Sequence, residues 1–354
     1  GLGYPPLRQP PIHPLPPTPP SQRKRLVGEC TALAAGGEYG IMVGVMPESD
    51  ISWAVLRRIV QNWAGAAVDL AEVKPLAGGC INTTLALKTS DGSRAVLKIS
   101  PHRVNREYAR EAEQLRVMRA HGLPAPQVYA CETGHLDDPH SYLLMEFIDG
   151  VDLKHARQRC PAEEYDRLQT QLAELVLKLH AHTGPRYQRV GEEGGEQFDS
   201  WPAFYHHVYD TVLREAEKTN LLAPKVRKAM SRVHERLESL LQHDDRPRLV
   251  HWDIWATNVL AAPNGDGRWR ITGLVDPNCK YAHFEAEIAY MELFGTITPA
   301  FLNTYQQTRK LPPEYHARRK IVYQIYPLLN HVQLFGAEYV KPLLSLVDRA
   351  SALV

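Results

Sequence analysis

The chain has 354 residues, 44% of them hydrophobic, which is long enough for two lobes with a substantial core. A formal net charge of +1 gives no overall field that would attract nucleic acid or an anionic membrane, and no apolar run reaches the ~18 residues that cross a bilayer. The five scattered cysteines form no Cys-x-x-Cys pair, so we expect a cytoplasmic protein without a disulfide framework or zinc site.

Residues 1–46 differ in composition from the rest of the chain. Prolines crowd the stretch 4–20, where they remove backbone donors and disfavour helix in their neighbours. We therefore expect a disordered Pro-rich tail. The chain does not start with Met, and Met46 stands just before the first convincing helix, so one interpretation of the tail is an over-extended gene start.

Two helices are predicted in the region 47–150. Ser49 is the expected N-cap of the first helix. Its apolar face is predicted to consist of Trp53, Leu56, Ile59, Val60 and Trp63. The second helix is predicted at about 105–121, because Gly122 and Pro124 then end it.

The same region contains five segments with the alternating pattern of strands. They are expected at 73–75, 83–88, 94–99, 128–131 and 142–147. Asp91 and Gly92 lie between the second and third segments and are typical of a hairpin turn. The pattern therefore predicts a small sheet with one helix inserted after its third strand.

From about residue 161 the chain has mainly helical periodicity. The exception is a predicted hairpin, whose strands at 259–262 and 268–274 flank an Asn-Gly-Asp-Gly turn. Residues 151–354 are therefore expected to form a larger, mainly helical unit.

The strongest chemical signal is His251-Trp252-Asp253, followed by Asn258 and Asp276. Phosphoryl transfer to an alcohol needs a carboxylate that accepts the hydroxyl proton and oxygen ligands that hold Mg²⁺ against the phosphates. Asp253 suits the first role. Asn258, five residues on, and Asp276, after the predicted hairpin, suit the second, because Mg²⁺ prefers hard oxygen ligands.

Lys98 lies in the apolar strand predicted at 94–99, where a lysine usually points to solvent. A glutamate from the following helix would instead hold its ammonium group against the ATP phosphates. Glu111 is the favoured partner, and Glu107 and Glu113 are the alternatives.

Two backbone segments complete a predicted nucleotide site. Gly78 and Gly79 lie between the first two strands, where glycine permits close approach of the backbone to phosphates. The link Glu146-Phe147-Ile148 follows the last strand of the small sheet, and its backbone carbonyl and amide groups are the natural partners of adenine. The alternative for both segments is an ordinary turn.

These four signals occur in the order found in the protein-kinase-like superfamily. Their details resemble the fructosamine kinase (ketosamine-3-kinase) family within the aminoglycoside phosphotransferase group. The resemblance covers roughly residues 50–345 and includes the blocks 200–205 and 276–289. It implies an α+β, protein-kinase-like, two-lobed fold with a small β-rich N-lobe at 47–150 and a larger, mainly helical C-lobe at 151–354.

The resemblance also implies roles and partners. Asp253 would be the catalytic base, Asn258 and Asp276 the metal ligands, and Lys98 with Glu111 the pair that holds the phosphates. The implied cofactors are ATP and Mg²⁺. The implied acceptor is a small-molecule hydroxyl, on a ketosamine or a related sugar. We expect no nucleic acid or membrane partner and a monomer or weak homodimer. The alternatives are an aminoglycoside- or choline-type kinase and a nucleotide-binding pseudokinase that acts by interaction.

The chain departs from the family at several positions expected near the acceptor. Trp252 stands where the family usually has Gly, Asn278 where it has a small residue, and Glu287 where it has Asp. In the same block, His283 and Glu285 are interpreted as braces of the strand before Asp276 rather than as substrate contacts. The sequence therefore determines the reaction better than the substrate.

Overall fold

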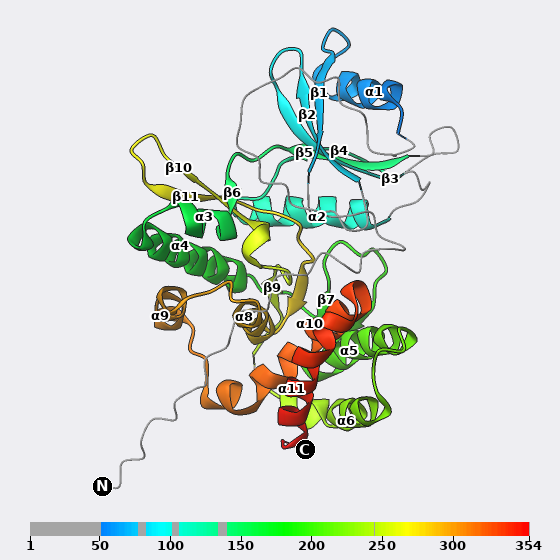
Figure 1. Cartoon of the computed structure of the whole chain (residues 1–354), viewed down its shortest axis with the longest axis vertical. Helices are drawn as coiled ribbons and strands as arrows, with labels where there is room; N and C mark the ends of the chain where they lie inside the picture. The colour runs from blue at the N-terminus through cyan, green and yellow to red at the C-terminus, as the bar shows by residue number, and fades with distance from the viewer. Residues whose placement is uncertain (1–50, 77–82, 101–105, 134–139, 244, 354) are drawn as a thin grey trace.

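The computed structural model describes residues 51–76, 83–100, 106–133, 140–243 and 245–353 (Figure 1). The predicted tail at 1–46 and the predicted glycines Gly78 and Gly79 lie outside these residues. Among the described residues, none of the helices is both long and apolar enough to cross a membrane.

Helix α1 (Trp53–Ala64) begins later than the sequence predicted. Its N-cap is Ser52, whose hydroxyl accepts a hydrogen bond from a backbone amide of the first turn, so the predicted cap at Ser49 is wrong. Trp53 is consequently the first helical residue, where its side chain is 42% exposed, and Ile51 just before the cap is buried instead. The predicted burial of Leu56, Ile59 and Val60 is confirmed, and Trp63 is partly buried against the same apolar cluster.

The N-terminal sheet has five antiparallel strands in the order β1-β2-β3-β5-β4. They are β1 (Leu70–Pro75), β2 (Thr83–Thr89), β3 (Arg94–Ser100), β4 (Val128–Glu132) and β5 (Ser141–Glu146). Helix α2 (Arg106–Ala120) follows the third strand, as predicted. In β5, Tyr142 and Leu144 pack in the apolar cluster that contains α1, whereas Leu143 and Met145 pack in the cluster that contains α2. Both faces of this strand are therefore covered.

The chain leaves the small sheet along the predicted hairpin. Strand β6 (Val151–Asp152) pairs with β10 (Val259–Pro263), which pairs with β11 (Trp269–Leu274). Gly150 has a φ of +150°, and a Cβ atom at this residue would lie 2.8 Å from the carbonyl oxygen of Ala261. Only glycine permits this close approach of the two backbones.

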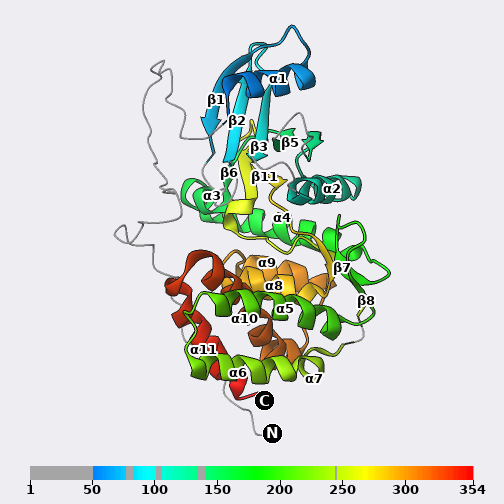
Figure 2. The same cartoon turned by 90° about the vertical axis from the view of Figure 1, so that its right-hand side faces the viewer.

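The part of the chain that follows is mainly helical, with α4 lying between the small sheet and the lower helices (Figures 1 and 2). Its helices are α3 (Leu153–Arg159), α4 (Ala162–Ala181), α5 (Trp201–Lys218), α6 (Pro224–Glu235), α7 (Leu237–Leu241), α8 (Phe284–Leu293), α9 (Pro299–Thr308), α10 (Lys320–Phe335) and α11 (Val340–Ser351). A large apolar cluster joins them and extends to α2.

Sequence analysis missed a four-stranded sheet in this region. Its strands, in the order β8-β7-β12-β9, are β7 (Tyr187–Arg189), β8 (Gln197–Phe198), β9 (Arg248–Val250) and β12 (Lys280–Ala282). Each has only two or three residues, so no alternation could be recognised before the pairing was known.

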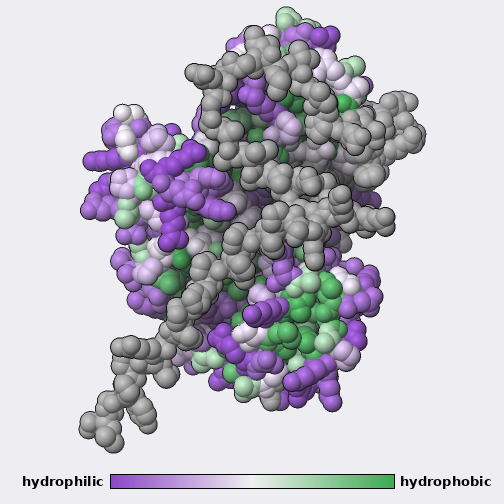
Figure 3. Space-filling model, in the orientation of Figure 1, coloured by the Kyte–Doolittle hydropathy of each residue, from purple (hydrophilic) through white to green (hydrophobic). Residues whose placement is uncertain are grey.

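Hydrophobic surface gathers over the helical region around α10 and α11 on the face shown in Figure 3. Leu334 and Phe335, at the end of α10, are each 44% exposed. Exposed apolar patches of this kind are typical of surfaces that contact another protein or a membrane. The predicted weak homodimer stays a prediction.

Helix α8 carries two buried glutamates, each with a partner on another element. Glu285 forms a paired salt bridge with Arg319, which precedes α10, and both N–O distances are 2.7 Å. The Glu287 carboxylate lies 2.8 Å from Nε2 of His180. Glu285 is therefore structural, but it ties α8 to α10 and not, as predicted, to the strand before Asp276.

Removing the Glu285 carboxylate should strongly destabilise the helical region. We expect Glu285→Ala to lower the free energy of unfolding by about 3–5 kcal/mol, because it leaves the Arg319 guanidinium buried without its partner. Urea unfolding followed by circular dichroism measures this loss. The double variant Glu285→Leu/Arg319→Leu should recover most of the stability, and a loss below about 1 kcal/mol in the single variant would contradict the assignment.

Candidate active site

Lys98 lies where the N-terminal sheet faces the end of the hairpin. Its Nζ atom is 2.6 Å from Oε1 of Glu111 on α2 and 2.6 Å from Oδ1 of Asp276. The rival glutamates are placed elsewhere, since Glu107 and Glu113 form ion pairs with arginines on their own helix. Of the three candidates for the lysine's partner, the structure thus selects Glu111.

The charge of Lys98 is stabilised by these two carboxylates. Burial alone would lower the pKa of the ammonium group, but the nearby Glu111 and Asp276 outweigh it, so the pKa is raised above its usual value. The Lys98 side chain is 13% exposed and that of Asp276 is 48% exposed. A permanently charged ammonium group is therefore presented beside a carboxylate that solvent can reach.

Asp276 follows β11 in a backbone conformation that few residues adopt. Its φ is +55°, in the left-handed region, which aspartate tolerates better than most side chains. The preceding residue, Val275, donates its backbone N–H to the carbonyl of Asn258 at 3.0 Å. This bond brings together the two segments that carry the predicted metal ligands.

Asp253 lies in the loop between β9 and the short 3₁₀ turn η1 (Ala256–Asn258). Nδ2 of Asn258 donates to the Asp253 backbone carbonyl at 3.0 Å and to its Oδ2 atom at 3.2 Å. The Tyr290 hydroxyl donates to Oδ1 of the same carboxylate. Burial raises the pKa of Asp253, and the hydrogen bond from Tyr290 acts in the opposite direction.

Asn258 and Asp276 form a donor set that fits Mg²⁺. The Asn258 amide nitrogen donates to Asp253, and the oxygen of the same amide accepts a long hydrogen bond of 3.5 Å from the Thr257 hydroxyl. An amide oxygen and a carboxylate are both hard ligands. The described residues contain no cluster of three or more His, Cys, Asp and Glu side chains that could hold a metal ion.

Glu146 and Phe147, predicted at the adenine site, begin the link between the small sheet and β6. The Glu146 backbone N–H donates to the backbone carbonyl of Gln127 at 2.8 Å, and the Glu146 carboxylate accepts from the backbone N–H of Gln127 at 3.0 Å. The guanidinium group of Arg94 lies 4.6 Å above the centre of the Phe147 ring. Both side chains thus fix the link to the sheet.

The remainder of the link is held from both sides. Arg94 on β3 forms a paired salt bridge with Asp149. The Ile148 side chain packs on β11 so closely that a Cβ atom on Gly273 would lie 2.6 Å from its Cδ1 atom. The link 146–150 is therefore clamped between β3 of the sheet and β11 of the hairpin.

Trp252, which departs from the family pattern, is held in an unusual conformation. Its φ is +69°, and its backbone N–H donates to Oε1 of Glu287 at 2.6 Å. The amino group of the buried Lys280 lies 4.6 Å from the centre of the indole, and Tyr326 meets the indole edge-on at 5.6 Å. Backbone and ring are thus fixed independently.

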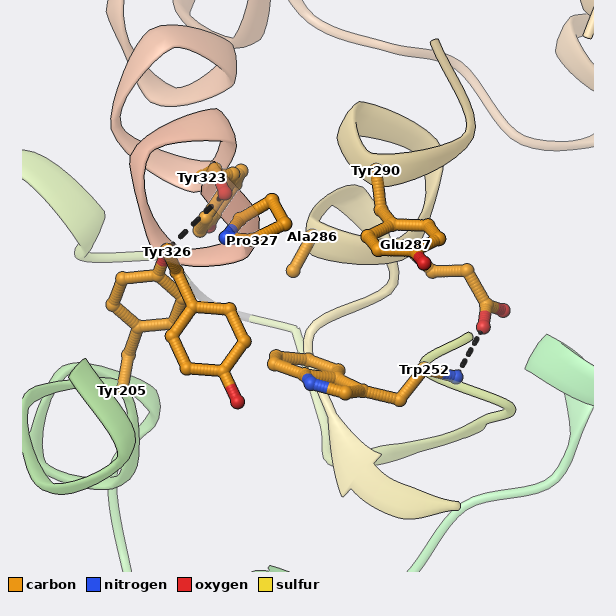
Figure 4. A pocket seen from close by; sticks show the side chains of 8 residues that line it. All are labelled: Tyr205, Trp252, Ala286, Glu287, Tyr290, Tyr323, Tyr326 and Pro327. Carbon is orange, nitrogen blue, oxygen red and sulfur yellow. Dashed lines mark hydrogen bonds between the residues drawn. The ribbon is translucent and has the colours of Figure 1, made fainter. Parts of the chain in front are cut away.

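A small pocket adjoins Trp252 and Tyr290 (Figure 4). It is lined by Tyr205, Trp252, Ala286, Glu287, Tyr290, Tyr323, Tyr326 and Pro327. The room between these side chains is about that of one water molecule. The indole and the tyrosine rings therefore leave little room between them.

The left-handed backbone of Trp252 gives a prediction about two substitutions. Trp252→Gly and Trp252→Ala both remove the indole, but only glycine adopts a φ of +69° without strain. We expect the glycine variant to be the more stable by about 1 kcal/mol, whereas alanine is the more stable residue at ordinary positions. Chemical unfolding of the two variants side by side measures this difference, and equal stabilities would contradict it.

Tyr290 is the residue of this site that sequence analysis missed. It lies 37 positions after Asp253, on a helix where an aromatic residue is expected to be part of the core. The sequence contained one signal for this role: Tyr290 is three residues from Glu287, so the two side chains share one face of α8.

Comparison with known proteins adds to this geometry. Residues 52–352 match a family model described as fructosamine kinase. A protein of Enterococcus faecium named as a ketoamine kinase is 29% identical over 76% of this chain and 91% of its own length. A crystal structure from Haemophilus somnus, named as a fructosamine-3-kinase, covers 84% of this chain and 97% of its own, with a TM-score of 0.68 and 21% identity.

A more distant likeness extends to an aminoglycoside phosphotransferase in complex with ADP and hygromycin B. That structure covers 85% of this chain and 97% of its own, with a TM-score of 0.60 and 16% identity. Together, these structures confirm the predicted α+β, protein-kinase-like fold.

Proposed function

Because the chain belongs to the fructosamine kinase family, we propose that it transfers the γ-phosphoryl group of Mg²⁺-bound ATP to a hydroxyl group of a ketosamine. The chain is a small-molecule kinase that uses ATP. The observation that carries the proposal is the convergence of Lys98, Glu111 and Asp276 next to the loop of Asp253 and Asn258.

In the proposed reaction, the acceptor oxygen forms a bond to the γ-phosphorus and the bond from this phosphorus to the β,γ-bridging oxygen breaks. Asp253 accepts the proton of the acceptor hydroxyl, and ADP is the leaving group. Lys98, held by Glu111, would bind phosphate oxygens. Asn258 and Asp276 would hold Mg²⁺, which when bound neutralises charge on the phosphates.

The nucleotide would lie between the two parts of the chain. We propose adenine at the backbone of Glu146 and Ile148, with Phe147 between them, and we keep Gly78 and Gly79, which lie outside the described residues, as the expected phosphate contacts. This placement agrees with the link that is clamped between β3, which carries Lys98, and β11, after which Asp276 follows. It also supports the division into an N-lobe at 47–150 and a C-lobe at 151–354. The monomeric or weakly dimeric state and the cytoplasmic location stay predictions.

The choice of a ketosamine is supported by the names of the relatives, a ketoamine kinase and a fructosamine-3-kinase. An aminoglycoside acceptor has only the shared fold in its favour. A pseudokinase is disfavoured because Lys98, Asp253, Asn258 and Asp276 are all present in a connected arrangement.

An acceptor screen tests the proposal. Purified protein with ATP and Mg²⁺ is incubated with fructosyl- and ribulosyl-lysine, and in parallel with an aminoglycoside, choline and free sugars. We expect ADP release and a phosphorylated product, detected by mass spectrometry, with the ketosamines alone. No turnover of either ketosamine at millimolar concentration would refute the acceptor. Binding of ATP without transfer to any compound would favour the pseudokinase.

A further inference from the structure

Helix α8 contacts two consecutive residues, Trp252 and Asp253, in the loop that carries the proposed base. Glu287 accepts the backbone N–H of Trp252 at 2.6 Å, and Tyr290 donates its hydroxyl to the carboxylate of Asp253. Glu287 and Tyr290 are three residues apart and therefore lie on the same face of the helix, as Figure 4 shows. The helix thus fixes the backbone before the base and the side chain of the base itself.

The helix that provides both contacts is firmly anchored. The Glu287 carboxylate also contacts His180, whose other ring nitrogen is 2.8 Å from the Tyr305 hydroxyl, and all three residues are buried. The ring of Tyr290 packs against Phe294, one turn further along α8, with 4.8 Å between the ring centres. The phenol is therefore presented to Asp253 from a rigid support.

The hydrogen bonds around Asp253 leave a defined place for the acceptor. Oδ2 accepts from Asn258 and Oδ1 from Tyr290, so each oxygen has one donor. An ionised carboxylate has about four lone-pair sites on its two oxygens. Oδ1 therefore still has one lone pair that can accept the hydrogen bond of the acceptor hydroxyl. The two existing hydrogen bonds fix the plane of the carboxylate.

The phenol is suited to act as a permanent donor. Burial and the neighbouring Asp253 carboxylate both raise the pKa of Tyr290 well above its usual value, so the hydroxyl keeps its proton in the working range of an enzyme. Tyr290 also lines the pocket beside Trp252. The phenol is thus close to the proposed reaction without a role in the transfer itself.

We propose that Tyr290 is a positioning residue, which fixes the Asp253 carboxylate in the orientation that accepts the proton of the acceptor hydroxyl. The inference rests on the proposed function, since it takes Asp253 as the base. Among the described residues, Asp253 without the phenol keeps only its side-chain contact with Asn258, and its carboxylate can turn. A misplacement of about 1 Å at a reacting group costs roughly 10²-fold in rate.

The test compares Tyr290→Phe with Tyr326→Phe on a ketosamine that the wild-type protein phosphorylates. The first variant keeps the ring and removes only the donor. The second removes a hydroxyl from the same pocket that interacts with the Trp252 side chain, and no hydrogen bond from it to Asp253 is found among the described residues. For Tyr290→Phe we expect kcat to fall by about 10–100-fold, with the KM values for ATP and acceptor within about twofold of wild type. Tyr326→Phe should keep most of the kcat, and thermal melting should show both variants folded.

A double-variant cycle separates positioning from a general structural effect. Asp253→Asn has no carboxylate for Tyr290 to orient. Adding Tyr290→Phe to this variant should therefore lower kcat by a further factor of less than about two. Full additivity of the two losses would overturn the inference, as would an unchanged kcat in Tyr290→Phe. A lower acceptor KM in Tyr290→Phe would also overturn it, because the phenol would then merely occupy the acceptor's place.

Failure of the proposed function would be recognised separately. If the wild-type protein phosphorylates no ketosamine, the proposed function is refuted and the inference falls with it. If the wild type is active and Asp253→Asn lowers kcat while Tyr290→Phe does not, only the inference is refuted.

Discussion

Replacing Asp253 by asparagine is expected to lower kcat by about 10²–10⁴, which is the usual loss when a general base is removed. Asparagine has nearly the same shape and can still accept the hydrogen bond from Tyr290, but its amide does not take up the proton of the acceptor. The affinity for ATP should change little, because in the described part of the chain Asp253 forms side-chain hydrogen bonds with Asn258 and Tyr290 and none with Lys98. Steady-state kinetics with the ketosamine, together with calorimetric titration of ATP, measures both quantities.

The outcome that would contradict the assignment of Asp253 is a collapse of ATP binding with little effect on turnover of bound substrates. The exposed aspartate Asp348 on α11 provides a control, since Asp348→Asn changes the same functional group at a distance from the site. Its kcat should equal that of the wild type.

Replacing Asp276 by alanine is expected to lower kcat/KM for Mg-ATP by roughly 10²–10³, the scale seen when one charge-stabilising contact is lost. Two effects combine in this variant. The proposed metal site loses its carboxylate, and Lys98 loses one of the two carboxylates that lie 2.6 Å from its Nζ atom. The Mg²⁺ concentration that supports half-maximal activity should therefore rise, and a titration with Mg²⁺ at fixed ATP measures it.

A matched control for this variant lies in the adjacent hairpin. Asp266 is an exposed aspartate in the turn between β10 and β11, and its ion pair with Arg268 is loose at 3.9 Å. Asp266→Ala should leave the Mg²⁺ dependence unchanged. If Asp276→Ala kept the Mg-ATP affinity of the wild type, its role as a metal ligand would be refuted.

The elements that the sequence predicted best are those whose pattern is local. The five strands of the small sheet, the helix α2 and the hairpin β10–β11 each repeat their apolar positions over several residues and end at glycine, proline or Asn-Gly turns. The short strands of the second sheet have no such pattern. Their partners lie up to about a hundred positions away, and only the folded chain brings them together.

The errors in the first helix have the same origin. Ser49 and Ser52 are equally good caps by residue type, and only the position of the first helical turn distinguishes them. Once Ser52 is the cap, Trp53 is the first helical residue and its side chain is partly exposed. A shift of three residues in the cap therefore leaves Trp53 outside the core in which it was predicted.

The sequence by itself determined the chemistry of this protein. The identities and spacing of Asp253, Asn258 and Asp276, with Lys98 in an apolar strand, predicted phosphoryl transfer, because few side chains can serve as the base or bind Mg²⁺ and phosphate. The family to which the chain belongs agrees with that prediction.

Only the tertiary structure decided which groups act together. It selected Glu111 from three glutamates, joined Lys98 to a carboxylate 178 positions away, and brought Tyr290 to Asp253. It also showed that Trp252 is held with a φ of +69° by a carboxylate from α8. Such contacts depend on how elements that are far apart in the sequence pack together. The pattern of residues along the chain predicts the elements but not their packing.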